Sequence, residues 1–278
     1  MKKGILLIIS LCILSSGLYA GEKNSFGTPI GSPYHTTYWI DIPIIAIGLG
    51  FSRPVINALR DRDPNMTDTE IEDLSPSDVW WLDRGAAKQN PARANDYLTV
   101  SSHLMRGSMF MPAFLLLDRR VRTIWKDYLI MYMEAQSVNA GIYQIGASLF
   151  PRKRPFMYNP DESMERKLGD NTTNSFFSGH TSVVATSCFF MVKVYYDLHP
   201  GAANRLVWYG LAALPPMAVG YCRYKGGKHF PTDILTGYAV GALSGILIPE
   251  WHKKTKGKYV CYPAFPNQKL GFYTRLYF

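Results

Sequence analysis

The 278-residue sequence contains few cysteines and none of the common motifs for binding zinc or nucleotides. Its four cysteines are Cys12, Cys188, Cys222 and Cys261, and no CxxC or Cys/His spacing relates them, which argues against a zinc site. There is no P-loop, no zinc finger and no aromatic-rich RNA motif, so nucleic acid is the weaker choice of partner. The net charge of +9 therefore favours anionic lipid or phosphate instead.

The chain also lacks the composition of a protein that lies in lipid along its whole length. Its mean hydropathy is −0.07, although hydrophobic residues make up 47% and aromatic residues 14%. Apolar segments must therefore alternate with substantial polar segments. A sizeable core is possible, and we expect one large domain after the leader.

The N-terminus has the features of a secretory leader. Lys2 and Lys3 precede the apolar run 4–13, and small residues lead to a cleavage site after Ala20. An uncleaved membrane anchor is the alternative. The predicted organisation is a leader or anchor at 1–20 and a single domain at 21–278. Within that domain, the motifs described below and the family that they resemble imply a catalytic core at about 128–250, followed by a C-terminal tail at 251–278.

Six later segments are apolar enough to form helices in or on a membrane. They are roughly Tyr38–Ile56, Tyr97–Leu117, Tyr128–Phe150, Thr181–Leu198, Leu206–Tyr221 and Pro231–Pro249. Several contain polar residues, such as Asp41 and Glu134. The predicted fold is therefore all-α: a bundle of five or six membrane-associated helices with a polar interior. A soluble all-helical domain is the alternative.

The charges of the connecting segments suggest an orientation. Short basic segments tend to stay in the cytoplasm. The chain has two such segments: one contains Arg119, Arg120, Arg122 and Lys126, and the other contains Lys253, Lys254, Lys256 and Lys258. The stretch 60–96, with nine acidic and five basic residues, suits the other side. The loops at Arg154 and Arg223 then also lie outside the cytoplasm.

A cleaved leader followed by six full crossings would instead put the Arg154 loop inside. Either the first segment does not cross fully or the leader is not a normal signal. Asp41 and Arg53 make the first segment the least convincing span, so we favour the first explanation.

Three further local patterns carry predictions. Ser75, Pro76 and Asp78 form a helix start, followed by Trp80 and Trp81, which suit either a membrane interface or the core. The alternating tail 269–278 is interpreted as a packed tail, and an outer-membrane role is the less favoured reading. Glu134, costly inside a membrane segment, is expected to bond a polar group on a neighbouring helix, with Arg106 the preferred candidate.

Three short clusters carry the chemistry. Arg154, followed by Pro155, offers a fork of N–H donors that matches phosphate oxygens. The run Ser178, Gly179 and His180 precedes an apolar helix, whose N-terminal N–H groups and dipole favour an anion. The third cluster contains Arg223, His229 and Asp233. There, the carboxylate is expected to reach back to His229 and fix its tautomer, leaving the other ring nitrogen free to attack.

The order RP, SGH and R-x5-H-x3-D resembles the three-part signature of the type 2 phosphatidic acid phosphatase superfamily. The strings RPFMYNP, SFFSGHTS and GYCRYKGGKHFPTD are similar to an envelope subgroup with leader sequences. The resemblance implies an all-helical bundle with its site at the non-cytoplasmic helix ends. It also implies residue roles: phosphate binding by Arg154, Ser178, Gly179 and Arg223, a general acid at His180, a nucleophile at His229 and its partner at Asp233.

Three positions depart from that signature. Phe177 replaces the usual Pro before SGH, and Cys222 replaces the usual Ser before the third-motif Arg. More consequential is Ala147, which occupies the position of a phosphate-binding Lys. Arg152 and Lys153 are the candidates to replace that cation.

The resemblance implies a metal-independent phosphatase that needs no cofactor and forms a phosphohistidine. Its expected partners are a membrane and a phosphorylated lipid: lipid A, undecaprenyl diphosphate, phosphatidylglycerol phosphate or phosphatidic acid. The expected location is a bacterial inner membrane with the site facing the periplasm, and outer-membrane association is less favoured. The alternatives are a vanadium-dependent haloperoxidase-like enzyme and a degenerate lipid-phosphate-binding protein. A metal site at His180, His229 and Asp233 is a remote third.

Overall fold

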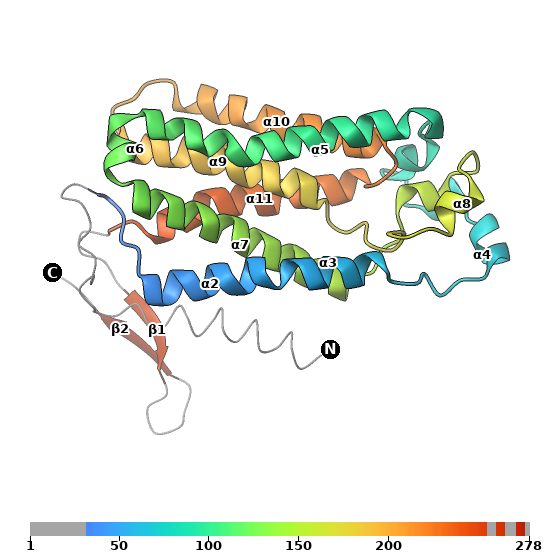
Figure 1. Ribbon diagram of the computed structural model, residues 1–278, viewed down its shortest axis with the longest axis horizontal. Helices are drawn as coiled ribbons and strands as arrows, with labels where there is room; N and C mark the ends of the chain where they lie inside the picture. The colour runs from blue at the N-terminus through green and yellow to red at the C-terminus, as the bar shows by residue number, and fades with distance from the viewer. Residues whose placement is uncertain (1–31, 255–259, 265–270, 276–278) are drawn as a thin grey trace.

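The computed structural model describes residues 32–254 and the backbone of two short segments, 260–264 and 271–275. The leader, with its cleavage site, and the side chains of the tail lie outside the described residues. Within them, the predicted all-α architecture is confirmed, because long helices lie side by side in one bundle (Figure 1).

Each predicted apolar segment forms a helix or a pair of helices. The long helices are α2 (Tyr38–Gly50), α3 (Ser52–Arg60), α5 (Ala94–Phe110), α7 (Trp125–Leu149), α9 (Gly179–Leu198), α10 (Arg205–Lys225) and α11 (Pro231–Trp251). The shorter helices are α4 (Asp68–Glu72), α6 (Arg119–Thr123) and α8 (Met164–Lys167), and η1 (Pro76–Asp78), η2 (Arg84–Lys88), η3 (Pro91–Arg93), η4 (Met111–Leu117) and η5 (Pro155–Tyr158). Near the C-terminus, β1 (Val260–Ala264) pairs antiparallel with β2 (Gly271–Arg275), a hairpin that the sequence did not predict.

Helix α9 lies at the centre of the bundle and packs against α5, α7, α10 and α11. Three glycines of α11, spaced four residues apart, face its backbone. A Cβ added at Gly237, Gly241 or Gly245 would lie 2.5, 2.1 or 2.6 Å from a carbonyl oxygen of α9 or of the residue before it. The two backbones are therefore in direct contact along this seam, which brings the start of α11 beside the start of α9.

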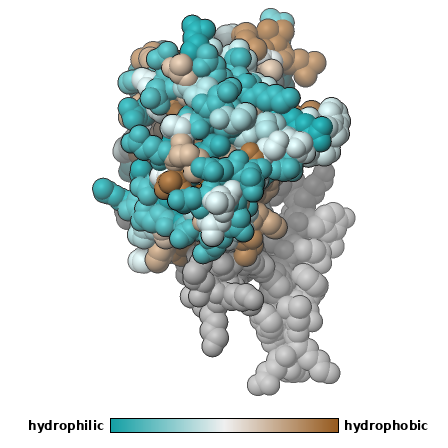
Figure 2. Space-filling view, turned by 90° about the vertical axis from the view of Figure 1, so that its right-hand side faces the viewer, coloured by the Kyte–Doolittle hydropathy of each residue, from teal (hydrophilic) through white to brown (hydrophobic). Residues whose placement is uncertain are grey.

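The segments with opposite charge lie at opposite ends of the bundle. The acidic stretch and the loops that follow α7 and α10 lie at the right-hand end in Figure 1, whereas α6 and the end of α11 lie at the left. The right-hand end is mostly hydrophilic, with hydrophobic residues near its edges (Figure 2). The predicted grouping of the Arg154 and Arg223 loops with the acidic stretch is confirmed.

Our explanation that the first segment does not cross the membrane fully stays a prediction. Helices α2 and α3 together run along the bundle from one end to the other (Figure 1). Among the described helices, Tyr38–Arg60 and Pro231–Trp251 are the two that are long and apolar enough to cross a membrane by length and composition. Asp41 does not oppose this, because its side chain is completely buried inside the bundle.

The bundle has polar residues inside and large apolar side chains outside. Gln136, Ser137 and Asn139 of α7 are buried, and Ser137 Oγ donates to the Ile44 carbonyl at 2.8 Å. By contrast, large apolar side chains are exposed on the outside of the bundle. Leu206 of α10 is one of them, and α5 and η4 expose Val100, Leu104, Met109, Phe110, Phe114, Leu116 and Leu117. A water-soluble helix normally shows the reverse pattern.

The local predictions have mixed outcomes. Ser75 caps η1 in a capping box with Asp78, as expected, and Trp80 and Trp81 are exposed, so they do not belong to the core. Glu134 does bond a polar group on another element, but the partner is His252 rather than Arg106. Arg106 is exposed on α5, and its positive charge contributes to lowering the pKa of His180.

Candidate active site

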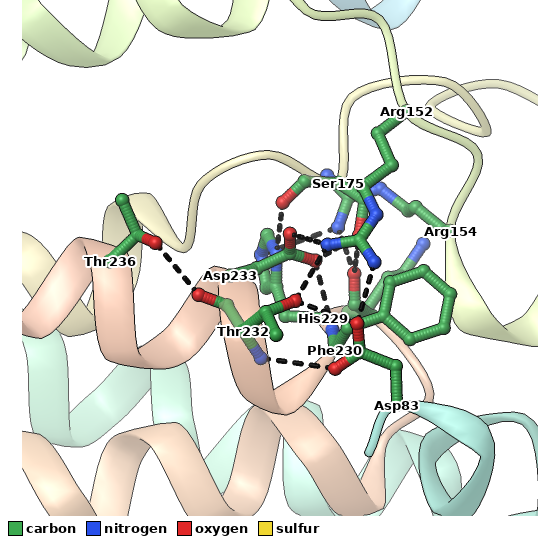
Figure 3. Close-up of polar contacts among 10 residues, drawn as sticks. Asp83, Arg152, Arg154, Ser175, His229, Phe230, Thr232, Asp233 and Thr236 are labelled. Atoms are coloured by element: carbon green, nitrogen blue, oxygen red, sulfur yellow. Dashed lines mark hydrogen bonds and ion pairs between the residues drawn. The ribbon is translucent and has the colours of Figure 1, made fainter. Parts of the chain in front are cut away.

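The three predicted clusters meet at the right-hand end of the bundle. Arg154 lies just before η5, Ser178 just before α9, and His229 between α10 and α11. Gly227 makes the turn after α10 with a φ of +65°, a left-handed conformation that favours glycine. Figure 3 shows Arg154, His229 and Asp233 converging on one place from separate segments.

Arg154 is buried and held by neutral acceptors. Its Nη2 donates to Asn171 Oδ1 at 3.0 Å and to Asn174 Oδ1 at 2.6 Å, and its Nη1 donates to the Lys228 carbonyl at 2.8 Å. Among the described residues, no carboxylate pairs with it and its buried Nε has no hydrogen-bond partner. Burial lowers the pKa of this guanidinium to about 10. The side chain is therefore fixed in place while its charge stays unneutralised.

Arg223, in the last turn of α10, is likewise a buried arginine with an unsatisfied donor. It is buried, and its Nε also has no hydrogen-bond partner in the part of the chain that the structure describes. Burial, with repulsion from Arg154 next in importance, lowers its pKa to about 9. Two buried, mutually repelling guanidinium groups with unsatisfied donors form a site for an anion.

His229 presents an unprotonated ring nitrogen to these arginines. Its Nδ1 lies 2.7 Å from the Ser175 carbonyl oxygen, which can only accept, so Nδ1 carries the proton. Its Nε2 lies 3.4 Å from Arg154 Nη1. Burial, together with Arg154 and Arg223, holds the pKa of this imidazole well below its usual value. His229 is therefore neutral, and its Nε2 lone pair faces the guanidinium of Arg154.

The expected pairing of Asp233 with His229 is wrong in this structure. Asp233 Oδ2 accepts from Ser175 Oγ at 2.6 Å and from the Phe230 N–H at 2.9 Å, and Oδ1 accepts from Arg152 at 2.5 Å (Figure 3). Because Asp233 lies in the first turn of α11, its carboxylate caps that turn and binds the side chain of Ser175. The residue that orients His229 directly is Ser175, through its carbonyl, and Asp233 acts through Ser175.

Arg152 is not free to bind phosphate. It donates to Asp233 and Thr232, and also to Asp83 at 2.7 Å, and its guanidinium stacks over Phe230. Its charge is thus neutralised by two buried carboxylates. Lys153 is partly exposed, and its charge acts on the carboxylate of Glu70. Of the two predicted replacements, Arg152 is therefore occupied by other partners, and a phosphate contact by Lys153 stays a prediction.

The start of α9 borders the same site, next to the two arginines and His229. The hydroxyl of Ser178 contacts Thr181 Oγ1 at 2.8 Å instead of capping the helix, which leaves the first N–H groups of α9 uncapped by that side chain. Gly179 is packed against Tyr143, where a Cβ would come within 3.2 Å of the ring. His180 follows, and burial with three nearby arginines lowers its pKa to about 2 in the absence of an anion.

Several residues of the site escaped the sequence analysis. Asn171, Asn174, Ser175 and Asp83 position other groups, and the sequence carries no signal for them because their partners are distant. Lys228 does have a signal, since it directly precedes His229. Its Nζ lies 4.6 Å from the centre of the Phe156 ring, and Arg154 and Arg223 are among the charges that act on it.

Comparison with protein families agrees with the motif analysis. The family model of the PAP2 superfamily matches residues 130–256. Two solved structures are similar: LpxE from Aquifex aeolicus (19% identity, 58% of this chain and 88% of that one, TM-score 0.39) and a transmembrane PAP2 type phosphatidylglycerolphosphate phosphatase from Bacillus subtilis (17% identity, 77% and 96%, TM-score 0.44). No curated protein matches the chain.

Proposed function

We propose that the chain is a member of the PAP2 superfamily, whose family model matches residues 130–256, and that it hydrolyses the phosphate ester or diphosphate of a lipid with His229 as nucleophile. The observation that supports this proposal most is the pair of buried guanidinium groups of Arg154 and Arg223, whose Nε atoms lack a partner within the described chain. The charges of both arginines act on His229, and Arg154 Nη1 lies 3.4 Å from its Nε2. Unsatisfied buried donors are rare in proteins, and their clustering here fits a bound phosphoryl group.

The reaction has two steps. The lone pair of His229 Nε2 forms a bond to phosphorus while the bond from phosphorus to the lipid oxygen breaks in line with it. His180 gives its proton to the departing oxygen and then takes one from the water that attacks the phosphohistidine. The products are the dephosphorylated lipid, or the lipid monophosphate from a diphosphate, and inorganic phosphate.

Charge stabilisation comes from groups that are already in place. Arg154, Arg223 and the first N–H groups of α9 face the phosphoryl oxygens, where negative charge is greatest in the transition state. The same arginines disfavour a proton on His180 when no anion is present. A bound phosphate dianion offsets their charge, so substrate binding itself raises the pKa of His180 and prepares it as the acid.

A lipid substrate follows from the position of the site. The anion site lies at one end of a bundle whose flanks expose large apolar side chains. A lipid in the adjoining leaflet could place its headgroup at that end without leaving the membrane. We place this end at the periplasmic face of a bacterial inner membrane, because the basic segments lie at the other end. Lipid A, undecaprenyl diphosphate, phosphatidylglycerol phosphate and phosphatidic acid are the candidate substrates.

Phosphate release from a panel of these four lipids, with and without EDTA, tests the proposal. We expect release from at least one lipid, no inhibition by EDTA at a temperature well below the melting temperature, and inhibition by orthovanadate competing for the anion site. Inhibition by EDTA that zinc or magnesium reverses would contradict the metal-independent mechanism.

The same assay separates the alternatives. Ala147 is the feature that favours a degenerate binding protein, which would bind lipid phosphate but release no phosphate from any member of the panel. A haloperoxidase would instead brominate an organic substrate when loaded with vanadate and given peroxide.

We also propose that Lys228 supplies the cation that Ala147 cannot. Burial, and after it the positive charge of Arg154, lowers the pKa of Lys228 to about 6. Above that pH the free side chain is neutral, so it must take up a proton in order to bind phosphate. Affinity for a phosphate inhibitor should therefore fall as the pH rises above 6. Lys228→Met should weaken inhibition about tenfold at a pH of about 6 and remove that part of the pH dependence.

The measurement is the inhibition constant of inorganic phosphate between about pH 6 and about pH 8 in both proteins, which cancels the titration of phosphate itself. Lys153→Met is the matched control and should behave as wild type. Equal pH slopes in wild type and Lys228→Met would show that Lys228 does not contact the anion.

A further inference from the structure

A second cluster of titratable groups lies near the opposite end of the bundle from the anion site. It consists of Asp41 on α2, Glu134 on α7 and His252 directly after α11. All three are buried, with 0%, 5% and 2% of their surfaces exposed. None of them takes part in the proposed phosphatase chemistry.

The geometry brings one oxygen or nitrogen atom of each residue together. One ligand atom from each lies within 4.8 Å of the other two. His252 Nε2 lies 2.6 Å from Glu134 Oε2, and His252 Nδ1 lies 2.9 Å from the His35 carbonyl oxygen. Nδ1 donates to the His35 carbonyl and Nε2 donates to the Glu134 carboxylate, so both ring nitrogens carry protons in this arrangement. A metal ion would replace the proton on Nε2 while Nδ1 keeps its bond to the carbonyl, the arrangement usual for metal-bound histidines.

Asp41 provides an independent indication of a ligand. Its Oδ2 accepts from the Thr37 N–H at 2.7 Å, but its buried Oδ1 has no hydrogen-bond partner among the described residues. A fully buried carboxylate oxygen without a partner is costly. Because Asp41 belongs to the cluster, a ligand bound between Asp41, Glu134 and His252 would supply the partner that Oδ1 lacks.

The charge of the cluster also calls for a cation. Two buried carboxylates face one imidazolium, which pairs with Glu134 and leaves one negative charge in the cluster. Nearby lysines are used elsewhere: Lys193 pairs with Asp197 and Glu250, and Lys254 Nζ donates to the Ser32 carbonyl. A divalent ion with a neutral histidine would make the site electrically neutral. We propose that Asp41, Glu134 and His252 bind one divalent transition-metal ion of the Zn²⁺ type.

The donor set fits that class of ion. One imidazole and two carboxylates suit Zn²⁺ or Mn²⁺ better than Mg²⁺ or Ca²⁺, which prefer oxygen alone. Ligands of a tetrahedral ion with bonds of about 2.0–2.1 Å are separated by about 3.3 Å. Glu134 and His252 would have to separate slightly from their present hydrogen-bond distance, and Asp41 would have to move closer.

The ion would join three parts of the chain that are far apart in sequence. Asp41 holds the first helix, Glu134 the central part of α7, and His252 the end of the last long helix. The segment before α2 meets the same place, because the His35 N–H donates to the His252 carbonyl at 2.8 Å. The ion would therefore be structural, and its loss would affect stability before catalysis.

Metal binding to the full-length, untagged protein in detergent tests the proposal. After dialysis against EDTA and removal of the chelator, we expect one equivalent of Zn²⁺ to bind and the melting temperature to rise. Co²⁺ should bind in its place with visible absorption bands that Zn²⁺ abolishes. Asp41→Asn and Glu134→Gln should each weaken the affinity at least tenfold, on the order of a lost ligand or outer-shell partner.

Two control variants establish that the metal binds at this cluster. Asp127→Asn removes a buried carboxylate at the same end of the bundle, where Ser32 and Thr36 donate to it, and should keep wild-type metal affinity. His229→Ala removes the proposed nucleophile and should do the same. Failure of wild type to bind Zn²⁺ or Co²⁺, or unchanged affinity in both ligand variants, would overturn the proposal. If the ligand variants do not fold, absence of the Co²⁺ bands in wild type would overturn it.

Discussion

His229→Ala is expected to lower the rate of phosphate release on the order of 10⁴ to 10⁶-fold, the range found when a catalytic nucleophile is removed. The reason is geometric. His229 Nε2 lies 3.4 Å from Arg154 Nη1, and the charges of Arg154 and Arg223 both act on this ring. In the proposed mechanism Nε2 is the nucleophile, and His180 has the role of acid and does not replace it. Steady-state phosphate release on the best lipid of the panel measures the effect.

The variant must also be shown to be folded. Circular dichroism and the melting temperature should match wild type, apart from the loss of the contact between Nδ1 and Ser175. His199→Ala is a matched control, because His199 lies at the end of α9 and faces Asp118, far along the helix from His180. Turnover of His229→Ala within about threefold of wild type would rule out the nucleophile assignment.

Asp233→Asn is expected to reduce both activity and stability. The carboxylate accepts from three donors: Ser175 Oγ, the Phe230 N–H and Arg152 Nη1. An asparagine must turn its NH₂ group toward at least one of them. Breaking one partner of a buried ion pair costs about 3–5 kcal/mol of unfolding free energy. Because Asp233 acts on His229 through Ser175, we expect a decrease in kcat/KM of about 10–100-fold, as for outer-shell partners.

Kinetics and denaturation of the same preparation measure the two effects. Asp83→Asn is the comparison, since Asp83 also binds Arg152 and the start of α11 but lies one contact further from Ser175. It should lose stability with a smaller change in rate. A loss of about 10⁴-fold in Asp233→Asn, with wild-type stability, is the result known for a carboxylate bonded directly to a catalytic histidine. It would restore the direct pairing that the sequence predicted.

The two arginines of the first motif show where prediction from sequence ends. Arg152 and Arg154 are both cationic and two residues apart, and the sequence nominated both for phosphate binding. In the structure, Arg152 forms ion pairs with Asp83 and Asp233. Arg154 instead donates to two asparagine side chains and to one backbone carbonyl, which carry no charge. Asp83 comes from the acidic stretch 60–96, 69 residues before its partner, and no local pattern predicts that contact.

The helices were predictable for a different reason. Apolar runs such as 231–249 determine both the existence and the length of a helix through local composition, and the structure extends this one by only two residues. The contact between Asp233 and His229 looked equally local, because the two residues are four apart. It was wrong because Ser175, brought in by the loop before α9, offers a carbonyl to His229 and a hydroxyl to Asp233.

The glycine seam between α9 and α11 limits how this enzyme could change. Where main chains touch, no side-chain exchange can move His180 relative to His229 without separating the helices themselves. Altered substrate preference must therefore arise elsewhere. A rim is formed by the segment between α3 and α5 and by the exposed Arg106. The side chain of Asp83 joins this rim to Arg152 and to the start of α11, and the rest of the rim is the place to vary. New headgroup specificities should accordingly be sought by varying that rim while leaving Gly237, Gly241 and Gly245 intact.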